Sequence, residues 1–236
     1  MVTKGVFITG TDTGVGKTEV TCQLAAELQS RGRSVGLYKP ACSGAIRHPD
    51  GHLIWEDVER LAAAIPAGIP REWICPQRFM APVAPPVAAR QEGTSVDGAL
   101  LRSGVHVWTG QVDFVLVEGA GGWKSPLTMQ ETVADVARDL NFPVLIVAAN
   151  RLGMLNQTIL TVESVKNCSL PLLGIVVNST SEGDDESCDS NSEILRQLVD
   201  VPVWGPLPWL SEITRIASPW PGDPLSELVT SIEKLG

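Results

Sequence analysis

The chain has 236 residues, which is enough for one large α/β domain with a substantial buried core. Its 18 Lys and Arg residues against 27 Asp and Glu residues give a formal net charge of −9, which disfavours nucleic acid as a partner because nucleic-acid binding favours a basic face. The five cysteines are scattered and include no Cys-x-x-Cys pair, which predicts reduced thiols. We find no signal sequence and no apolar run near the roughly 18 residues of a membrane span, and we therefore predict a cytoplasmic protein without a membrane segment.

The first predicted elements surround a glycine-bearing turn. Residues 5–9 are apolar and typical of a buried strand, and residues 19–31 carry apolar side chains at helical spacing. The turn between them, Gly10-Thr-Asp-Thr-Gly-Val-Gly-Lys-Thr18, is typical of a phosphate-binding loop, because its N–H groups and the helix N-terminus converge on an anion. Lys17 is placed to reach the outer phosphates and the Thr18 hydroxyl to hold a magnesium ion.

The spacing of this turn departs from the usual pattern of Gly, four residues, then Gly-Lys-Ser/Thr. The residue five places before Gly16 is Thr11, so Gly10 stands one position too early. A glycine-rich turn without a ligand therefore remains an alternative to a phosphate-binding loop.

The next elements are less regular. We predict a strand over 34–39 that ends at Pro40, loops over 41–44 and 47–51, and a helix from near residue 54 that stops at Pro66. Residues 67–87 are rich in proline and are predicted to be irregular, and residues 96–107 to form a short helix. An irregular stretch as long as 67–87 indicates either a functional loop or an unrecognised element.

The second half alternates strands and helices. The strongly apolar strand 113–118 ends on Glu118 and is followed by a turn at 119–122. Residues 181–193 are acidic and serine-rich, and we predict a solvated loop and helix start there. The remaining predicted strands are 143–148, 172–177 and 203–207, and the remaining helices are 132–140, 154–166, 194–198 and 225–234.

Continuous apolar strands alternating with amphipathic helices predict a mostly parallel, doubly wound sheet covered by helices on both faces. We therefore predict one three-layer α/β/α domain of the P-loop NTPase type over residues 1–236. Right-handed crossovers bring the carboxyl ends of the strands to one edge, where ligands bind. The polar residues expected at that edge are those of 10–18, Lys39, Glu118, Asn150 and Asn178.

These strand-end residues have the chemistry of a nucleoside-triphosphate site. Glu118 is placed to position magnesium beside Thr18, although a solvated acid is the alternative. Lys39 and Lys17 together would neutralise charge on a transferred phosphoryl group, although a lysine before a proline is also compatible with simple exposure. The Ser43 hydroxyl is placed to hydrogen-bond a substrate oxygen.

Other motifs are weaker. His48 and His52 are four residues apart, but Pro49 and Gly51 between them are incompatible with a helical metal-binding pair, so we predict a surface loop. His106 is isolated, and no Ser/His/Asp arrangement is apparent.

Four segments taken together resemble the dethiobiotin synthetase family. They are 10–18, Tyr38-Lys-Pro-Ala-Cys-Ser-Gly44, Val117-Glu-Gly-Ala-Gly-Gly-Trp123 and Pro208-Trp-Leu210, in matching order and spacing over essentially the whole chain. The early glycine of the loop is also the family's pattern. The resemblance implies a cytoplasmic homodimer that uses ATP and Mg²⁺ to convert 7,8-diaminononanoate and CO2 to dethiobiotin, ADP and phosphate.

The resemblance also implies roles for individual residues. Lys17 and Lys39 are the expected catalytic residues, Thr18 with Asp57 and Glu118 the expected magnesium ligands, and Asn178 the residue that reads adenine. The expected nucleotide-binding positions are Gly14, Val15, Gly16, Lys17, Thr18, Glu19, Asp57, Glu118, Gly119, Ala120, Gly121, Asn178, Ser179, Pro208, Trp209 and Leu210.

The expected substrate-binding positions lie in three places. Thr13 and Ser43 belong to the two loops, while Gly153, Met154, Leu155 and Asn156 at a helix start bind the substrate carboxylate from the neighbouring subunit. Two departures from the family pattern stand out. Gly14 occupies a position where many members have an acid, and the acidic segment near Asp184 aligns with nothing in the family.

Two other functions use the same loop. A partitioning-type switch ATPase usually carries an extra lysine at the start of the loop, where this chain has Thr11-Asp-Thr13. An amidoligase acting on a corrin-type acid normally continues into a glutamine-hydrolysing domain, whereas this sequence ends at Gly236. Phosphate release that depends on diaminononanoate distinguishes the ring-closing ligase from both.

Overall fold

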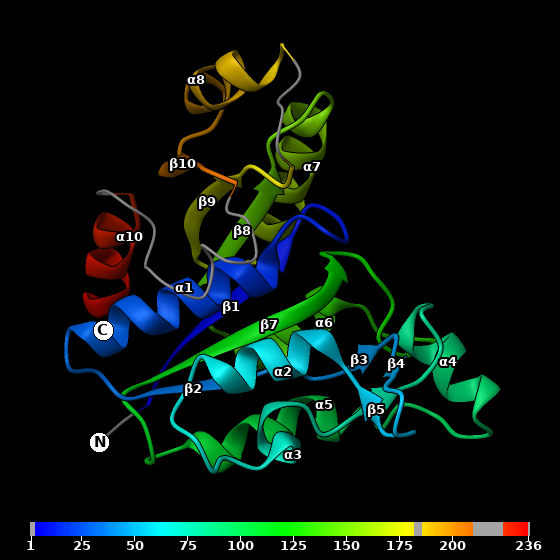
Figure 1. Cartoon of the computed structure of the whole chain (residues 1–236). Coiled ribbons are helices and arrows are strands. Elements are labelled where there is room, and N and C mark those ends of the chain that lie inside the picture. Colours follow the sequence, from blue (N-terminus) through cyan, green and yellow to red (C-terminus); the bar gives the residue numbers. More distant parts are fainter. Residues whose placement is uncertain (1–2, 182–185, 210–223, 236) are drawn as a thin grey trace.

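The computed structural model of the chain describes residues 3–181, 186–209 and 224–235. A six-stranded sheet forms its centre, with strand order β10-β9-β8-β1-β7-β2, and every pairing in it is parallel (Figure 1). The strands are β1 (Lys4–Gly10), β2 (Val35–Tyr38), β7 (Phe114–Gly122), β8 (Val144–Ala149), β9 (Leu172–Asn178) and β10 (Val203–Leu207).

Helices cover both faces of this sheet. The strand order reverses direction after β2, so right-handed crossovers put α1 on one face and α6, α7 and α8 on the other. Helices α2 and α10 pack against α1 and complete its layer. The helices are α1 (Lys17–Ser30), α2 (Glu56–Ala63), α3 (Arg71–Ile74), α4 (Pro85–Gln91), α5 (Leu100–Ser103), the 3₁₀ helix η1 (Gly104–Trp108), α6 (Val133–Leu140), α7 (Met154–Lys166), α8 (Cys188–Leu198) and α10 (Pro224–Glu233).

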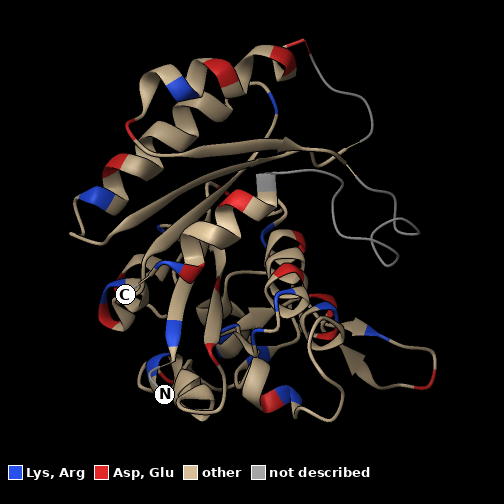
Figure 2. Cartoon of the chain, turned by 90° about the vertical axis from the view of Figure 1, so that its left-hand side faces the viewer, with Lys and Arg blue, Asp and Glu red and all other residues tan. Residues whose placement is uncertain are grey.

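The apolar runs of the strands explain why the sheet is central. All six residues of β8 are buried, as are Val6, Phe7 and Ile8 of β1. Each fully buried aliphatic or aromatic side chain contributes ~1.5–3 kcal/mol relative to its exposed state. Most of the charged residues visible in Figure 2 lie on helices and loops, which leaves the strands to form the core. The predicted doubly wound α/β fold is therefore confirmed.

The structure corrects several predicted boundaries around the sheet. Strand β7 does not stop at Glu118, because Gly122 still pairs with Gly10 of β1, so the predicted turn at 119–122 is the end of the strand. The helix expected from near Ile54 begins at Glu56. Residues Leu53–Ile54 form β5 instead, which pairs antiparallel with β4 (Ile46–Arg47).

The stretch 67–87, predicted to be irregular, contains α3, β6 (Arg78–Phe79) and the start of α4. Strand β6 pairs in parallel with β3 (Cys42–Ser43), which brings two loops distant in sequence side by side. The helix predicted over 96–107 is α5 followed by η1, and α8 begins at Cys188 inside the segment predicted as a loop. Asp184 lies outside the described residues.

None of the helices within the described ranges combines the length and apolarity required to cross a bilayer. Cys22, Cys42, Cys75 and Cys168 are free thiols, as their scattered positions predict.

Candidate active site

The loop between β1 and α1 has the backbone of an anion cradle. Gly14 and Gly16 adopt left-handed conformations with φ of 73° and 91°, which side chains other than glycine rarely tolerate. A Cβ on Gly16 would also lie 2.1 Å from the amide nitrogen of Asn178. Gly16 is the N-cap of α1, and no side chain caps the helix there, so its first N–H groups are suited to bind an anion.

Four polar side chains from different elements form one hydrogen-bonded cluster beside this loop. Lys39, which follows β2, donates from Nζ to Glu118 Oε1 at 2.5 Å and to Asp57 Oδ2 at 2.7 Å. Thr18 Oγ1 at the start of α1 lies 2.8 Å from Glu118 Oε1 and 3.1 Å from Asp57 Oδ1. The parallel sheet thus brings the end of β2, the middle of β7 and the first turns of α1 and α2 together.

The oxygen atoms of this cluster fit a magnesium ion. Glu118 is fully buried, and its Oε2 has no hydrogen-bond partner among the described residues. A buried carboxylate oxygen without a partner is unfavourable unless a cation compensates for its lost hydration. The Thr18 hydroxyl and the Asp57 carboxylate supply further oxygen donors of the kind that Mg²⁺ prefers.

The two lysines experience opposite electrostatic effects. Burial disfavours the charged form of Lys39, but the adjacent carboxylates of Glu118 and Asp57 outweigh burial and raise its pKa above the ordinary value. For Lys17, burial and then the positive charge of Lys39 lower the pKa to about 8. Lys17 donates to the Asp12 carbonyl at 3.0 Å, and its charge is poorly compensated until an anion binds.

A cavity of about 720 Å³ opens between the phosphate-binding loop and the cluster. Its size is in the range of small-molecule and cofactor sites. Its wall consists of Thr13, Gly14, Gly16, Lys17, Thr18, Glu19, Lys39, Cys42, Ser43, Asp57, Arg60, Pro82, Val83, Ala84, Pro85, Glu118, Ala120, Gly121, Ser125, Pro126, Asn178, Ser179, Thr180 and Pro208.

Most of the predicted nucleotide-binding residues therefore line one cavity. Val15 and Gly119 are buried behind its wall, and the Val15 carbonyl accepts a hydrogen bond from Asn178 Nδ2 at 3.1 Å. Pro208 lines the cavity, and the half-buried Trp209 beside it is not among the lining residues. Leu210 lies outside the described residues.

The predicted substrate-binding residues divide into two groups. Thr13 and Ser43 line the cavity, and the Ser43 hydroxyl donates to the Val83 carbonyl at 2.6 Å. Residues 153–156 form the turn and first residues of α7 after β8 and do not line the cavity of a single chain. Their role in a neighbouring subunit stays a prediction.

Sequence reasoning missed part of the wall. Arg60 lines the cavity, and its guanidinium forms an ion pair with Glu19, which also accepts a hydrogen bond from Gln23. The only signal for Arg60 was its place three residues after Asp57, on the same side of α2. Pro82 and Pro85 were missed because they reach the cavity through the pairing of β3 with β6, which joins segments far apart in sequence.

Comparisons with known proteins identify relatives over nearly the whole chain. A family described as "AAA domain" matches residues 4–217. The ATP-dependent dethiobiotin synthetase BioD of Anaeromyxobacter dehalogenans (strain 2CP-C) is 43% identical over 91% of this chain and 94% of its own length. The enzyme of the same name from Bacillus subtilis (strain 168) is 39% identical over 90% of each chain.

Solved structures with a similar fold are more distant in sequence. The cell division ATPase MinD of Pyrococcus furiosus is 18% identical with a TM-score of 0.52, and the alignment covers all of both chains. The signal recognition particle receptor FtsY of Elizabethkingia anophelis is 15% identical with a TM-score of 0.52, and the alignment covers 98% of this chain and 65% of the receptor. At these identities the likeness concerns the fold alone, and it agrees with the parallel sheet and its loop.

Proposed function

We infer that this chain, which belongs to the ATP-dependent dethiobiotin synthetase family, closes the ureido ring of dethiobiotin from 7,8-diaminononanoate and CO2 with ATP. The observation that carries the inference is the convergence of Lys17, Lys39, Asp57 and Glu118 on one cavity beside the phosphate-binding loop. These are the positions that the family resemblance requires, and they come from four separate segments of the chain.

The reaction divides into three steps. One substrate amine attacks CO2 and loses a proton, which gives a carbamate. A carbamate oxygen then attacks the γ-phosphorus of ATP and expels ADP, which leaves a carbamic–phosphoric anhydride. The second amine attacks the carbonyl carbon of this anhydride, expels phosphate and loses a proton as the ring closes. Every leaving group comes from ATP or the substrate, so the protein supplies positioning and charge.

Lys39 is suited to stabilise the transferring phosphoryl group. Its raised pKa keeps the ammonium charged at neutral pH, and its two carboxylate partners hold it in one position. Lys17 and the N–H groups of the loop bind the outer phosphates, and the phosphates compensate the charge of Lys17. Thr18, Asp57 and Glu118 would hold Mg²⁺, which neutralises phosphate charge when bound.

Other residues of the cavity wall are suited to bind adenine and the carbamate. Asn178 Nδ2 is bound to the Val15 carbonyl, so its Oδ1 is left to accept from the amino group of adenine. Ser43 lies in the same cavity as Lys39, and because its hydroxyl donates to the Val83 carbonyl, its oxygen is left to accept from the carbamate N–H. Cys42 is also close, but burial raises the pKa of its thiol to about 11, so a covalent step through this thiol is disfavoured at neutral pH.

A homodimer would complete the substrate site. Gly153 is exposed and left-handed with φ of 89°, and it opens α7 with N–H groups suited to a carboxylate. Leu152 beside it is 79% exposed. Sedimentation equilibrium tests this: a twofold mass supports the shared site, and a monomer that turns over at full rate contradicts it.

The decisive experiment measures ATP hydrolysis with and without diaminononanoate and bicarbonate and identifies the product by mass. We expect phosphate release to require both compounds and dethiobiotin to appear with it. ATP consumption that is indifferent to the diamine would contradict a ring-closing ligase and favour a switch ATPase on the same fold.

A further inference from the structure

A short hairpin outside the cavity gathers two histidines and an aspartate. Strands β4 and β5 pair antiparallel, and the tip between them spans residues 48–52. The tip is closed by hydrogen bonds from His48 N to His52 O and from Gly51 N to His48 O, both at 2.9 Å. Gly51 has φ of 93°, which permits the tight turn.

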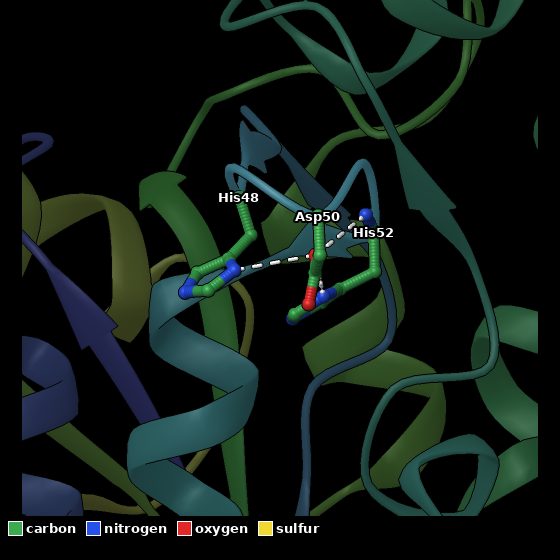
Figure 3. A group of neighbouring side chains, drawn as sticks. All are labelled: His48, Asp50 and His52. Atoms are coloured by element: carbon green, nitrogen blue, oxygen red, sulfur yellow. Dashed lines mark hydrogen bonds and ion pairs between the residues drawn. The ribbon is translucent and has the colours of Figure 1, made fainter.

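The three side chains converge on one point, as Figure 3 shows. Asp50 Oδ1 lies 3.2 Å from His48 Nδ1 and also contacts His52 Nδ1. The two imidazole rings stack, with centroids 4.6 Å apart and planes inclined at 26°. One ligand atom from each residue lies within 4.8 Å of the others, and all three side chains are more than 45% exposed to solvent: 50% for His48, 60% for Asp50 and 55% for His52.

We propose that this tip is a second metal site, which binds one borderline transition-metal ion such as Zn²⁺ through His48, Asp50 and His52, with water at the remaining positions. Two imidazole nitrogens and one carboxylate oxygen form a donor set typical of zinc sites that keep an open position. Imidazole also suits Cu²⁺ and Ni²⁺, whereas Mg²⁺ prefers oxygen ligands only. The proposal therefore distinguishes this tip from the oxygen cluster of the active site.

The backbone of the tip holds the three side chains close together, which favours binding of one ion by all three. The interaction of both imidazoles with one Asp50 oxygen shows that their nitrogens already face a common point, which a cation can occupy in place of the hydrogen-bond protons. The ligands lie within five consecutive residues held by two backbone hydrogen bonds, so little chain has to be ordered on binding. Exposure gives an ion direct access from solvent.

The test uses the full chain without an affinity tag, treated with a chelator and then kept in a phosphine reductant. Zn²⁺ is titrated by calorimetry in the presence of saturating Mg²⁺ and ADP, so that the oxygen cluster is occupied. We expect one equivalent of Zn²⁺ to bind, and His48→Ala/His52→Ala to weaken binding at least ~10–100-fold. His106→Ala is the matched control, because His106 is exposed and lies in η1, and it should leave binding unchanged.

A second readout needs no variant. Co²⁺ bound at the tip should broaden the ring NMR signals of His48 and His52 and leave those of His106 sharp. Zn²⁺ binding that survives in the double variant, or broadening of other residues in place of these rings, would assign the ion to thiols or to the active site and overturn the proposal. Failure of both metals to bind stoichiometrically would overturn it as well. None of these outcomes depends on the ligase reaction.

Discussion

Removal of the Lys17 charge should stabilise the protein in the absence of nucleotide. Lys17 is only 7% exposed, and burial and the nearby Lys39 charge lower its pKa from 10.5 to about 8. The folded state therefore holds this ammonium at a cost that the unfolded chain does not bear. Lys17→Met retains an unbranched side chain and removes the charge, so it removes the cost.

The size of the effect follows from the pKa. A shift of one unit corresponds to about 1.36 kcal/mol, so the charge of Lys17 destabilises the folded state by roughly 3 kcal/mol at neutral pH. The variant also loses the hydrogen bond to the Asp12 carbonyl, which destabilises its folded state by about 0.5–1.5 kcal/mol. We expect a net gain of roughly 1–3 kcal/mol in the free energy of unfolding, or about 2–12 °C in Tm.

The stability difference between the wild type and Lys17→Met should depend on pH. Below about pH 8 both the folded and the unfolded wild-type chain hold the Lys17 proton, so the cost is complete. Between about pH 8 and 10.5 only the unfolded chain binds the proton, so wild-type stability rises with pH relative to the variant. The advantage of Lys17→Met should therefore shrink across this window and vanish above it.

Urea denaturation between pH 7 and 10.5 measures this difference directly. Lys124→Met is the control, because Lys124 is exposed and its removal should change the free energy of unfolding little. MgATP should raise the Tm of the wild type and of the control, but not that of Lys17→Met. A Lys17→Met protein that is no more stable than the wild type at pH 7 would refute the electrostatic argument.

Three other substitutions test the rest of the site. Lys39→Ala should lower turnover at least ~10²–10³-fold while MgATP binding largely survives, and an unchanged kcat would remove Lys39 from the mechanism. Because two carboxylates lose their partner, the same substitution should lower the free energy of unfolding by about 3–5 kcal/mol. Glu118→Gln should weaken Mn²⁺ binding, measured by electron paramagnetic resonance, at least ~10-fold, and equal affinity in both proteins contradicts the assigned ligand. Gly16→Ala should abolish nucleotide binding by calorimetry, because φ is 91° and the new methyl group meets Asn178, whereas Gly68→Ala, with φ of 94° and open space, should bind normally.

The sequence predicts the site wherever an apolar run ends on a polar residue. The apolar run before Glu118 and the strand before Lys39 each point to the same sheet edge, and hydrophobic periodicity suffices to find such ends. Asp57 has no such signal, because it lies in the first turn of α2 and only the family resemblance singles it out. Arg60 and the wall at 82–85 escape both arguments, since they reach the cavity through packing and non-local pairing.

The sequence prediction is wrong for the glycines after Glu118. Four small residues in 119–122 predict a turn locally, but β1 offers a parallel partner and β7 continues to Gly122. The predicted helix start near Ile54 is wrong for a similar reason, because Leu53–Ile54 pairs with β4 and α2 begins at Glu56. In both places pairing with a neighbouring strand overrides local propensity.

Carbon-13 bicarbonate provides the most direct test of a ligase built around Lys17, Lys39 and Glu118. The protein is incubated with MgATP, diaminononanoate and labelled bicarbonate, and the product is followed by ¹³C NMR beside an assay for ADP. We expect the label in the ureido carbonyl of dethiobiotin, with equal amounts of dethiobiotin and ADP. ADP that accumulates while all of the label stays in bicarbonate and CO2 would contradict the ring-closing reaction.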